Sequence, residues 1–250
     1  MWNNYLRAGL CVTLGLLAQL TVQQAAADVL GGTIGINLWA QEYDARARDG
    51  GDFIDFDSSF DIDDETDYQV FASFEHPIPL IPNILVQHTA SSTSGVGVIG
   101  STIFDGVELE GEVVGDLDLT HTDATLYYEI LDNWLNLDIG LTARKFDASV
   151  ELTAEDGTTA SADADDVLPL AYVRAQFDLP FTGWKVRATG NYVKYDGDSI
   201  ADLSGAVGYE FFAGLEVELG YRIFDIDYSD GEELVDAEVR GLYGGIVWDF

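Results

Sequence analysis

The chain has 250 residues and a formal net charge of -34, from 45 Asp and Glu residues against 11 Lys and Arg residues. Such an acidic surface repels nucleic acid and anionic lipid headgroups, which excludes both as direct partners unless cations bridge the contact. The counts of 26 Gly, 12 Tyr and 13 Phe against one Met and five Pro are typical of strands, tight turns and aromatic girdles.

The first 27 residues have the layout of a secretory signal peptide. Arg7 provides a positive start, residues 10–20 form an apolar core, and three alanines at 25–27 precede Asp28. The apolar stretch is shorter than the roughly 18 to 20 residues that a membrane-spanning helix needs. We therefore predict a signal peptide over 1–27 and one barrel domain over 28–250. Because the only cysteine, Cys11, lies in the leader, we expect no disulfide and no thiolate chemistry after cleavage.

Alternation of apolar and polar residues recurs in segments of about the 9 to 11 residues with which a strand crosses an outer membrane. In the first of them, Ile34, Ile36 and Leu38 are expected to face lipid, and Asn37 and Trp39 the interior. The ten segments are 33–41, 68–75, 84–92, 117–130, 135–148, 167–177, 184–195, 203–212, 215–228 and 235–250. The predicted fold is all-β, a transmembrane antiparallel up-and-down β-barrel of about ten strands.

Two other strand numbers stay open. Eight strands would result if two hairpins lay wholly outside the membrane, and twelve if residues 53–62 formed a hairpin of their own. A soluble β-sandwich also has alternating strands, but the leader and the aromatic residues near strand ends favour the membrane barrel.

The connections between these segments alternate in character. Those after the second, fourth, sixth and eighth segments are short, whereas those after the first, third, fifth and ninth are longer and acidic. The connection after the seventh segment is short and departs from this pattern. Short periplasmic turns and longer external loops are typical of outer-membrane barrels, so both ends of the chain are expected on the periplasmic side.

The interior is expected to carry the charged chemistry of the barrel. The alternation assigns to the lumen Arg144, Arg174, Lys185, Arg187, Arg222, Arg240, Glu129, Asp138, Glu210, Glu216 and Glu218. Because a ten-stranded barrel is only slightly wider than an eight-stranded one, whose side chains just fill it, these charges could pair and close the lumen. They could also line a narrow pore that selects small anions or zwitterions.

The longer connections are rich in oxygen ligands. Residues 44–67 alone contain ten Asp and Glu residues, a density that could hold calcium or magnesium. The segment 225–233 looks like a calcium loop but has Asp230 where the EF-hand needs glycine. We expect a solvated acidic surface, no metal site and no cofactor.

An active site would have to be built around His76, His88 or His121, the three histidines of the chain. Asp123 lies on the same predicted inward face as His121, with the hydroxyl residues Ser91, Ser92 and Thr125 within plausible reach. A His-Asp pair and a hydroxyl could serve acyl transfer. No Gly-x-Ser-x-Gly elbow occurs in the sequence, however, and we expect no enzymatic activity.

Both ends of the predicted barrel carry short motifs. The stretch DVLGGTIG at 28–35, Leu38-Trp39 and the closing YGGIVWDF at 243–250 resemble an uncharacterised proteobacterial family of outer-membrane β-barrel proteins with an N-terminal Gly-Gly motif. The resemblance implies this fold in the outer membrane of a Gram-negative bacterium, and no catalytic residues. The terminal Trp248 and Phe250 look like the signal read by the barrel-assembly machinery, which would make that machinery and periplasmic chaperones transient partners.

Together these features predict a monomeric integral outer-membrane barrel that acts as a narrow, porin-like channel for small solutes. The alternative is a plugged structural barrel with an acidic extracellular surface for adhesion or divalent cations.

Overall fold

A computed structural model describes residues 30–49, 54–62, 64–230 and 233–250. The predicted signal peptide lies outside these described residues. The elements are β1 (Gly31–Asp49), β2 (Ile54–Asp55), α2 (Phe56–Ser59), β3 (Phe60–Ile62), β4 (Glu65–Glu75), β5 (Asn83–Thr89), β6 (Ser92–Phe104), β7 (Val107–Asp118), β8 (His121–Leu131), β9 (Leu135–Phe146), β10 (Ala148–Ala154), β11 (Thr159–Ala164), β12 (Val167–Asp178), β13 (Trp184–Tyr195), β14 (Asp198–Phe212), β15 (Leu215–Asp230) and β16 (Glu233–Asp249). Within the described ranges, no helix is long and apolar enough to cross a membrane.

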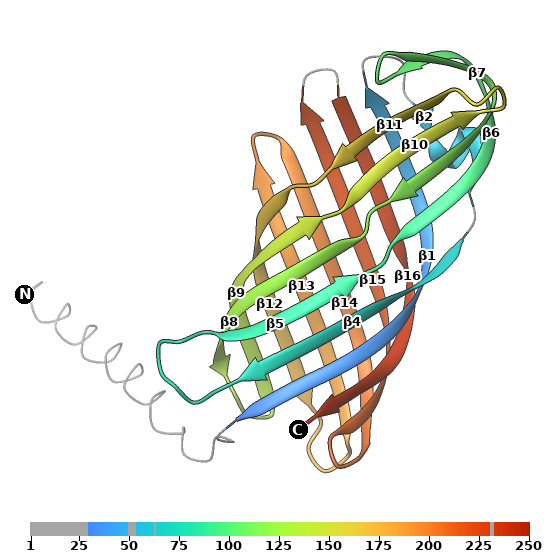
Figure 1. Ribbon diagram of the computed structural model, residues 1–250. Coiled ribbons are helices and arrows are strands. Elements are labelled where there is room, and N and C mark those ends of the chain that lie inside the picture. Colours follow the sequence, from blue (N-terminus) through green and yellow to red (C-terminus); the bar gives the residue numbers. More distant parts are fainter. Residues whose placement is uncertain (1–29, 50–53, 63, 231–232) are drawn as a thin grey trace, which may run out of the picture.

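Ten of these strands close into an antiparallel barrel (Figure 1). The order around the barrel is β1, β4, β5, β8, β9, β12, β13, β14, β15 and β16, and β16 pairs with β1 from Thr33 opposite Asp249 to Asp49 opposite Glu233. Closure leaves no free sheet edge in the barrel wall. The predicted fold class is confirmed, and each of the ten predicted segments overlaps one barrel strand, although 84–92 extends to the start of β6 and 117–130 begins within β7. The described part of 53–62 contains β2, α2 and β3 rather than a further barrel hairpin.

The two faces of the barrel wall follow the predicted alternation. On β1, Ile34, Ile36 and Leu38 are exposed on the outside, whereas Asn37 and Trp39 are buried inside. The outward apolar band carries exposed aromatic side chains near both ends, such as Trp134 and Trp184 toward one end and Tyr68, Tyr192 and Tyr221 toward the other, where charged residues follow. Those charged residues are Glu42, Lys145, Asp225 and Arg240. An apolar outer band with an aromatic girdle is the surface that a lipid bilayer covers.

The two ends of the barrel differ in their connections. At the turn end, where β1 begins and β16 ends, the strands are joined by the connections 76–82, 132–134, 179–183 and 213–214 (Figure 1). The opposite end is called the loop end. There the short connection after the seventh predicted segment is a tight turn, in which Asp196 and Gly197 both have positive φ, as a two-residue hairpin of type I′ requires.

The long connections at the loop end are themselves strands, which we did not expect. β6 and β7 form one hairpin and β10 and β11 another, and with β3 they make a second sheet in the order β11, β10, β7, β6, β3. β7 pairs with β10 just as β8 pairs with β9, so this sheet continues the barrel wall beyond the apolar band (Figure 1). The charged residues that suggested loops lie on its solvent face.

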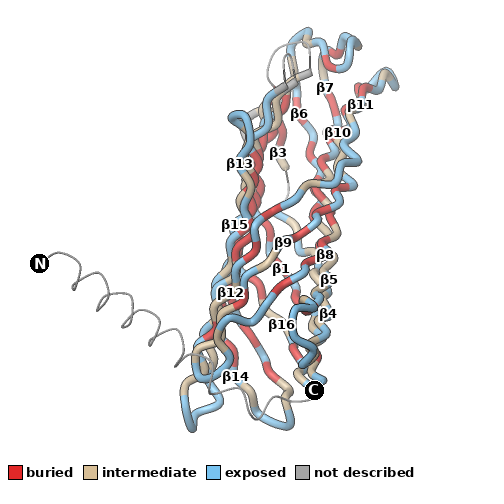
Figure 2. Tube along the Cα trace, turned by 90° about the vertical axis from the view of Figure 1, so that its left-hand side faces the viewer, coloured by how far each residue is buried: buried red, intermediate tan, exposed pale blue. Residues whose placement is uncertain are grey.

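The second sheet faces the extended ends of β1, β15 and β16. Figure 2 shows buried positions along the inner sides of these two opposing walls. The side chains between them form an apolar core that includes Ala45, Ile54, Phe56, Phe60, Phe104, Leu109, Val113, Leu152, Ala160, Phe224, Ile226 and Val239.

Candidate functional site: the barrel interior

A cluster of ionised side chains crosses the lumen below the apolar core. Arg144 on β9 donates to both oxygens of Asp123 on β8, with Nε to Oδ1 at 2.8 Å and Nη2 to Oδ2 at 2.7 Å. The same Nη2 reaches across the barrel to Oδ2 of Asp202 on β14 at 2.6 Å. Arg222 on β15 donates to Asp202 from Nε at 2.8 Å and from Nη2 at 2.7 Å. With His121, these four residues are called the central cluster.

The central cluster is charge-balanced and dry. Two guanidinium groups face two carboxylates, and all four side chains are at most 5 % exposed. Paired, bidentate hydrogen bonds between arginine and carboxylate are strong, and they offset much of the cost of removing the charges from water, although Nη1 of Arg144 has no hydrogen-bond partner among the described residues. The cluster therefore acts as a cross-brace between opposite sides of the barrel.

His121 completes the cluster as a neutral side chain. Its Nδ1 lies 2.9 Å from the carbonyl oxygen of Leu119 and donates to it, while Nε2 lies 3.3 Å from Nη2 of Arg222 and accepts from it. The imidazole packs against Phe224, with ring centroids 4.9 Å apart. Both arginines also stack on aromatic rings, Arg222 on Trp39 at 4.7 Å and Arg144 on Phe224 at 5.2 Å.

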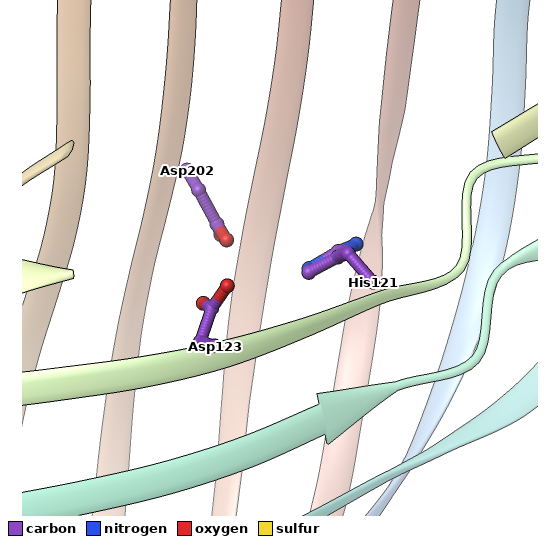
Figure 3. Close-up of side chains that lie close together, drawn as sticks. All are labelled: His121, Asp123 and Asp202. Carbon is purple, nitrogen blue, oxygen red and sulfur yellow. The ribbon is translucent and has the colours of Figure 1, made fainter. Parts of the chain in front are cut away.

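Figure 3 shows that His121, Asp123 and Asp202 point toward one another, with ligand atoms that all lie within 4.8 Å. The spacing of these ligand atoms would suit a metal ion, but the charges that surround them do not favour a cation. Arg144 and Arg222 already donate to both carboxylates and to the imidazole, and their positive charges repel a cation. The donor set therefore fits an ion-pair network better than a metal centre.

The hydroxyl groups considered for acyl transfer have other partners. Ser91 Oγ lies 3.1 Å from the hydroxyl of Tyr43, and Thr125 Oγ1 lies 2.7 Å from Oγ1 of Thr142. Ser92 is exposed. Because Nε2 of His121 faces Arg222, the nitrogen that a general base needs is occupied.

The other two histidines do not take part in the central cluster: His88 lies on the outer face of the wall, with Nδ1 3.0 Å from Oγ1 of Thr122. His88 packs its ring 6.0 Å from that of Tyr68 on the outer face, and His76 accepts the amide of Ile78 in the turn that follows β4. The arrangement favours structural roles for all three.

A second group of charges, the lower cluster, lies nearer the turn end. Lys185 on β13 lies 3.2 Å from carboxylate oxygens of Glu210, Glu216 and Asp249. Arg187 is 2.5 Å from Glu218 and 3.3 Å from Glu216, and Asn37 donates to Glu218 across the closing seam at 2.9 Å. These contacts join β13, β14, β15, β16 and β1 through their inward side chains.

All of the residues predicted to line the lumen lie inside the barrel, except for Arg240. Arg144 and Arg222 belong to the central cluster; Lys185, Arg187, Glu210, Glu216 and Glu218 belong to the lower cluster; Arg174, Glu129 and Asp138 line a cavity at the turn end. Arg240 faces outward instead, with its side chain 48 % exposed and paired with Glu42 and Glu238. It lies two residues before the lipid-facing Leu242 and so shares its face, which corrects the inward assignment.

Two cavities lie in the part of the interior toward the turn end. A cavity of about 90 Å³ lies between the two clusters, and a wider one of about 300 Å³, called the vestibule, opens at the turn end. Thr33 and Arg174 line both. Beyond the central cluster, the apolar core lies between the two opposing walls.

Sequence reasoning missed the carboxylates that neutralise the two central arginines. Asp123 was considered only as a partner of His121, and Asp202 fell just before the predicted start of its strand at 203. Since β14 begins at Asp198, Asp202 is a strand residue, and it shares the inward face with Ser204. Two arginines that face inward need carboxylate partners, and this need is the signal that could have pointed to Asp123 and Asp202.

The closing residues of β16 lie on the lipid face. Trp248 and Phe250 are 46 % and 64 % exposed, and their rings lie 5.3 Å apart. Trp248 Nε1 donates to the carbonyl oxygen of Ala213 in the neighbouring turn. Their role as an assembly signal stays a prediction.

No family model and no curated protein matches this chain. Among solved structures, the outer membrane protease OmpT from Escherichia coli is similar at 10 % identity with a TM-score of 0.56, over 92 % of this chain and 100 % of OmpT. The translocator domain of autotransporter NalP from Neisseria meningitidis has 12 % identity and a TM-score of 0.43, over 99 % and 98 % of the two chains. The P. putida toluene transporter TodX has 9 % identity and a TM-score of 0.33, over 90 % of each chain. The likeness to OmpT shows that this chain has the fold of an outer-membrane β-barrel.

Proposed function

We propose that this protein is a closed outer-membrane barrel that does not conduct solutes. The barrel anchors an outer part, which consists of the second sheet and the extended ends of β1, β15 and β16 and has an apolar core and an acidic surface. The observation that carries this proposal is the central cluster, in which Arg144 joins Asp123 to Asp202 across the lumen at 2.7 Å and 2.6 Å. The turn end then faces the periplasm and the loop end the cell exterior.

The apolar core supports a closed lumen at the loop end. Phe56 and Phe60 stack with centroids 5.3 Å apart inside the mouth, and Leu152, Val113 and Leu109 are at most 1 % exposed. An ion or polar solute would have to leave water to cross this layer, at a cost of several kcal/mol for each unpaired polar group. The interior at the loop end is therefore packed like that of a soluble protein.

The solvent face of the second sheet gives the outer part its charge. Glu108, Glu110, Glu112 and Asp116 follow one another on the exposed face of β7, and Glu151 on β10 lies opposite Asp116. Exposed carboxylates at this spacing repel one another and attract mobile cations, which salt screens over about 8 to 10 Å. The outer part would thus present a rigid acidic surface to divalent cations or to basic partners.

Several finer predictions belong to this proposal. They are a bacterial outer-membrane location, a monomeric state, the absence of catalysis, membership of the Gly-Gly family and transient contact with the assembly machinery. Gly32 has a physical reason to be glycine here: its backbone pairs with that of Phe250 at 3.0 Å and 2.9 Å, and a Cβ on it would lie 2.9 Å from the Phe250 ring and 3.1 Å from the carbonyl oxygen of Ser73.

The channel remains the competing function, and liposome swelling tests it. Vesicles that contain the protein are diluted into small sugars or amino acids, and swelling is followed by light scattering. We expect vesicles that contain the protein to swell at the same rate as protein-free vesicles. Swelling that depends on solute size would favour the channel that the sequence predicts.

A further inference from the structure

The vestibule contains a buried carboxylate, Asp138, of which one oxygen lacks a hydrogen-bond partner among the described residues. Asp138 on β9 is only 5 % exposed and lines the vestibule. Among the described residues its Oδ1 has no hydrogen-bond partner, and its carboxylate forms no ion pair. A buried charge without a partner is costly, and in native proteins such a group points to an ion or ligand.

The neighbours of Asp138 increase the negative potential. Glu129 on β8 lies directly opposite Asp138 in the strand pairing, and like charges in that position destabilise a sheet. Glu75 and Asp132 line the same vestibule. Glu75 accepts only the neutral hydroxyl of Tyr127, at 2.7 Å, and Glu129 only the amide of Asn83, at 3.3 Å, within the described chain.

The cations nearby are directed elsewhere. Arg174 lies opposite Asp138 on β12 and is the positive charge that attracts it, but its Nη2 donates to Gln176 at 3.0 Å and no ion pair closes between Arg174 and Asp138. Lys185 binds Asp249 at the edge of the vestibule, and it also contacts Glu210 and Glu216. The four carboxylates of Asp138, Glu129, Glu75 and Asp132 therefore exceed the positive charge available to them.

The spacing of these groups decides which cation fits. In the described chain, the vestibule carboxylates do not bring three ligand atoms within 4.8 Å of one another, so no chelate for a bare metal ion is preformed. The cavity of about 300 Å³ has room for a larger ligand. Separate carboxylates in a solvated cavity suit separate N–H donors on a flexible chain.

We propose that the vestibule binds a small organic cation with two or more primary ammonium groups, one of them held by Asp138 and Glu129 and another by Glu75 or Asp132. This site does not depend on whether the lumen conducts. It lies at the end opposite the acidic outer part, and its ligand would come from the compartment that the turn end faces.

Isothermal titration of the purified protein in detergent micelles with spermidine, a linear triamine, tests this site. At about 0.15 M NaCl, which screens diffuse attraction, we expect saturable binding that weakens about tenfold or more in Asp138→Asn, because one charge-assisted hydrogen bond is lost. Glu129→Gln, at a more exposed position, should weaken it in the same direction. Glu112→Gln removes an equal charge from the outer part and should change affinity less than about twofold.

Two results would overturn the proposal. One is equal loss in Asp138→Asn and Glu112→Gln, which would mean diffuse attraction to an acidic protein. The other is stoichiometric displacement of spermidine by MgCl2 at equal concentration, which would assign the vestibule to a divalent metal ion.

Discussion

The two halves of the barrel interior are filled by opposite means. Toward the loop end, side chains such as Phe104 and Leu152 pack in an apolar core; toward the turn end, arginines and carboxylates pair across the lumen. Apolar packing tolerates exchange between residues of similar volume, whereas a buried ion pair fails when either partner is removed. The comparison indicates that the outer part is a conventional core on top of a barrel that is braced by specific pairs.

The largest effect is expected from breaking the central cluster. Asp202→Ala would leave Arg144 and Arg222 with an uncompensated buried charge, and we expect a loss of about 3 to 5 kcal/mol in the free energy of unfolding. Guanidinium unfolding in phospholipid vesicles measures it. Asp236→Ala is the control, because the ion pair of Asp236 with Arg46 is exposed and contributes about 0 to 1 kcal/mol. Equal losses in the two variants would contradict the bracing role.

Breaking the apolar half should cost slightly less. Leu152 is fully buried, and Leu152→Ala is expected to destabilise the protein by about 2 to 5 kcal/mol through lost burial and the cavity left behind. The matched control is Val98→Ala on the same sheet, where the side chain is 77 % exposed and the change should stay within about 0.5 kcal/mol. If Leu152→Ala unfolds like the control, the outer part does not fold around this core.

The seam between β1 and β16 offers a sharper test of the ionic half. A methyl group on Gly245 would overlap the carbonyl oxygen of Ile36 and the side chain of Asn37, which donates to Glu218. We expect Gly245→Ala to cost about 1 to 3 kcal/mol. Gly244→Ala is the control, since the nearest atom to its methyl would lie at 3.5 Å. Heat stability on electrophoresis of the folded barrel distinguishes them, and equal melting of both would argue against tight closure at this seam.

The smallest effect concerns pH and lies outside both halves. Beyond the apolar band, burial raises the pKa of the Asp225 carboxyl, and the carboxylates of Glu238 and Asp236 raise it further. A raised pKa in the folded state means that folding takes up protons, so this group stabilises the fold as pH falls toward its ordinary range and loses that contribution as pH rises above it. After solvent screening we expect a gain within about 1 kcal/mol. Asp225→Asn should abolish this part of the pH dependence of unfolding; an unchanged profile would contradict it.

Much of the barrel could be predicted because its strands alternate with period two between lipid and lumen. The second sheet could not be predicted in the same way, because on β7 the buried Leu109, Val113 and Leu117 alternate with exposed carboxylates, and such a density of charge is also typical of external loops. A strand that faces water on one side carries polar residues there as a rule.

The site was predictable only in part. The inward register of Arg144 and Arg222 follows from alternation, but their pairing with Asp202 depends on which strands lie across the lumen, and no local pattern contains that information. The vestibule could not be predicted for the same reason, because it depends on how the ends of the strands are spaced around the barrel.

The central claim is that the lumen is closed, and single-channel recording in planar bilayers tests it most directly. Wild-type protein should insert without discrete conductance, and Arg222→Glu should destabilise the barrel, whereas the exposed control Arg46→Glu should leave it folded and silent. Discrete, ion-selective steps from the wild-type protein, with a reversal potential that shifts in Arg222→Glu, would contradict the closed barrel and establish a pore.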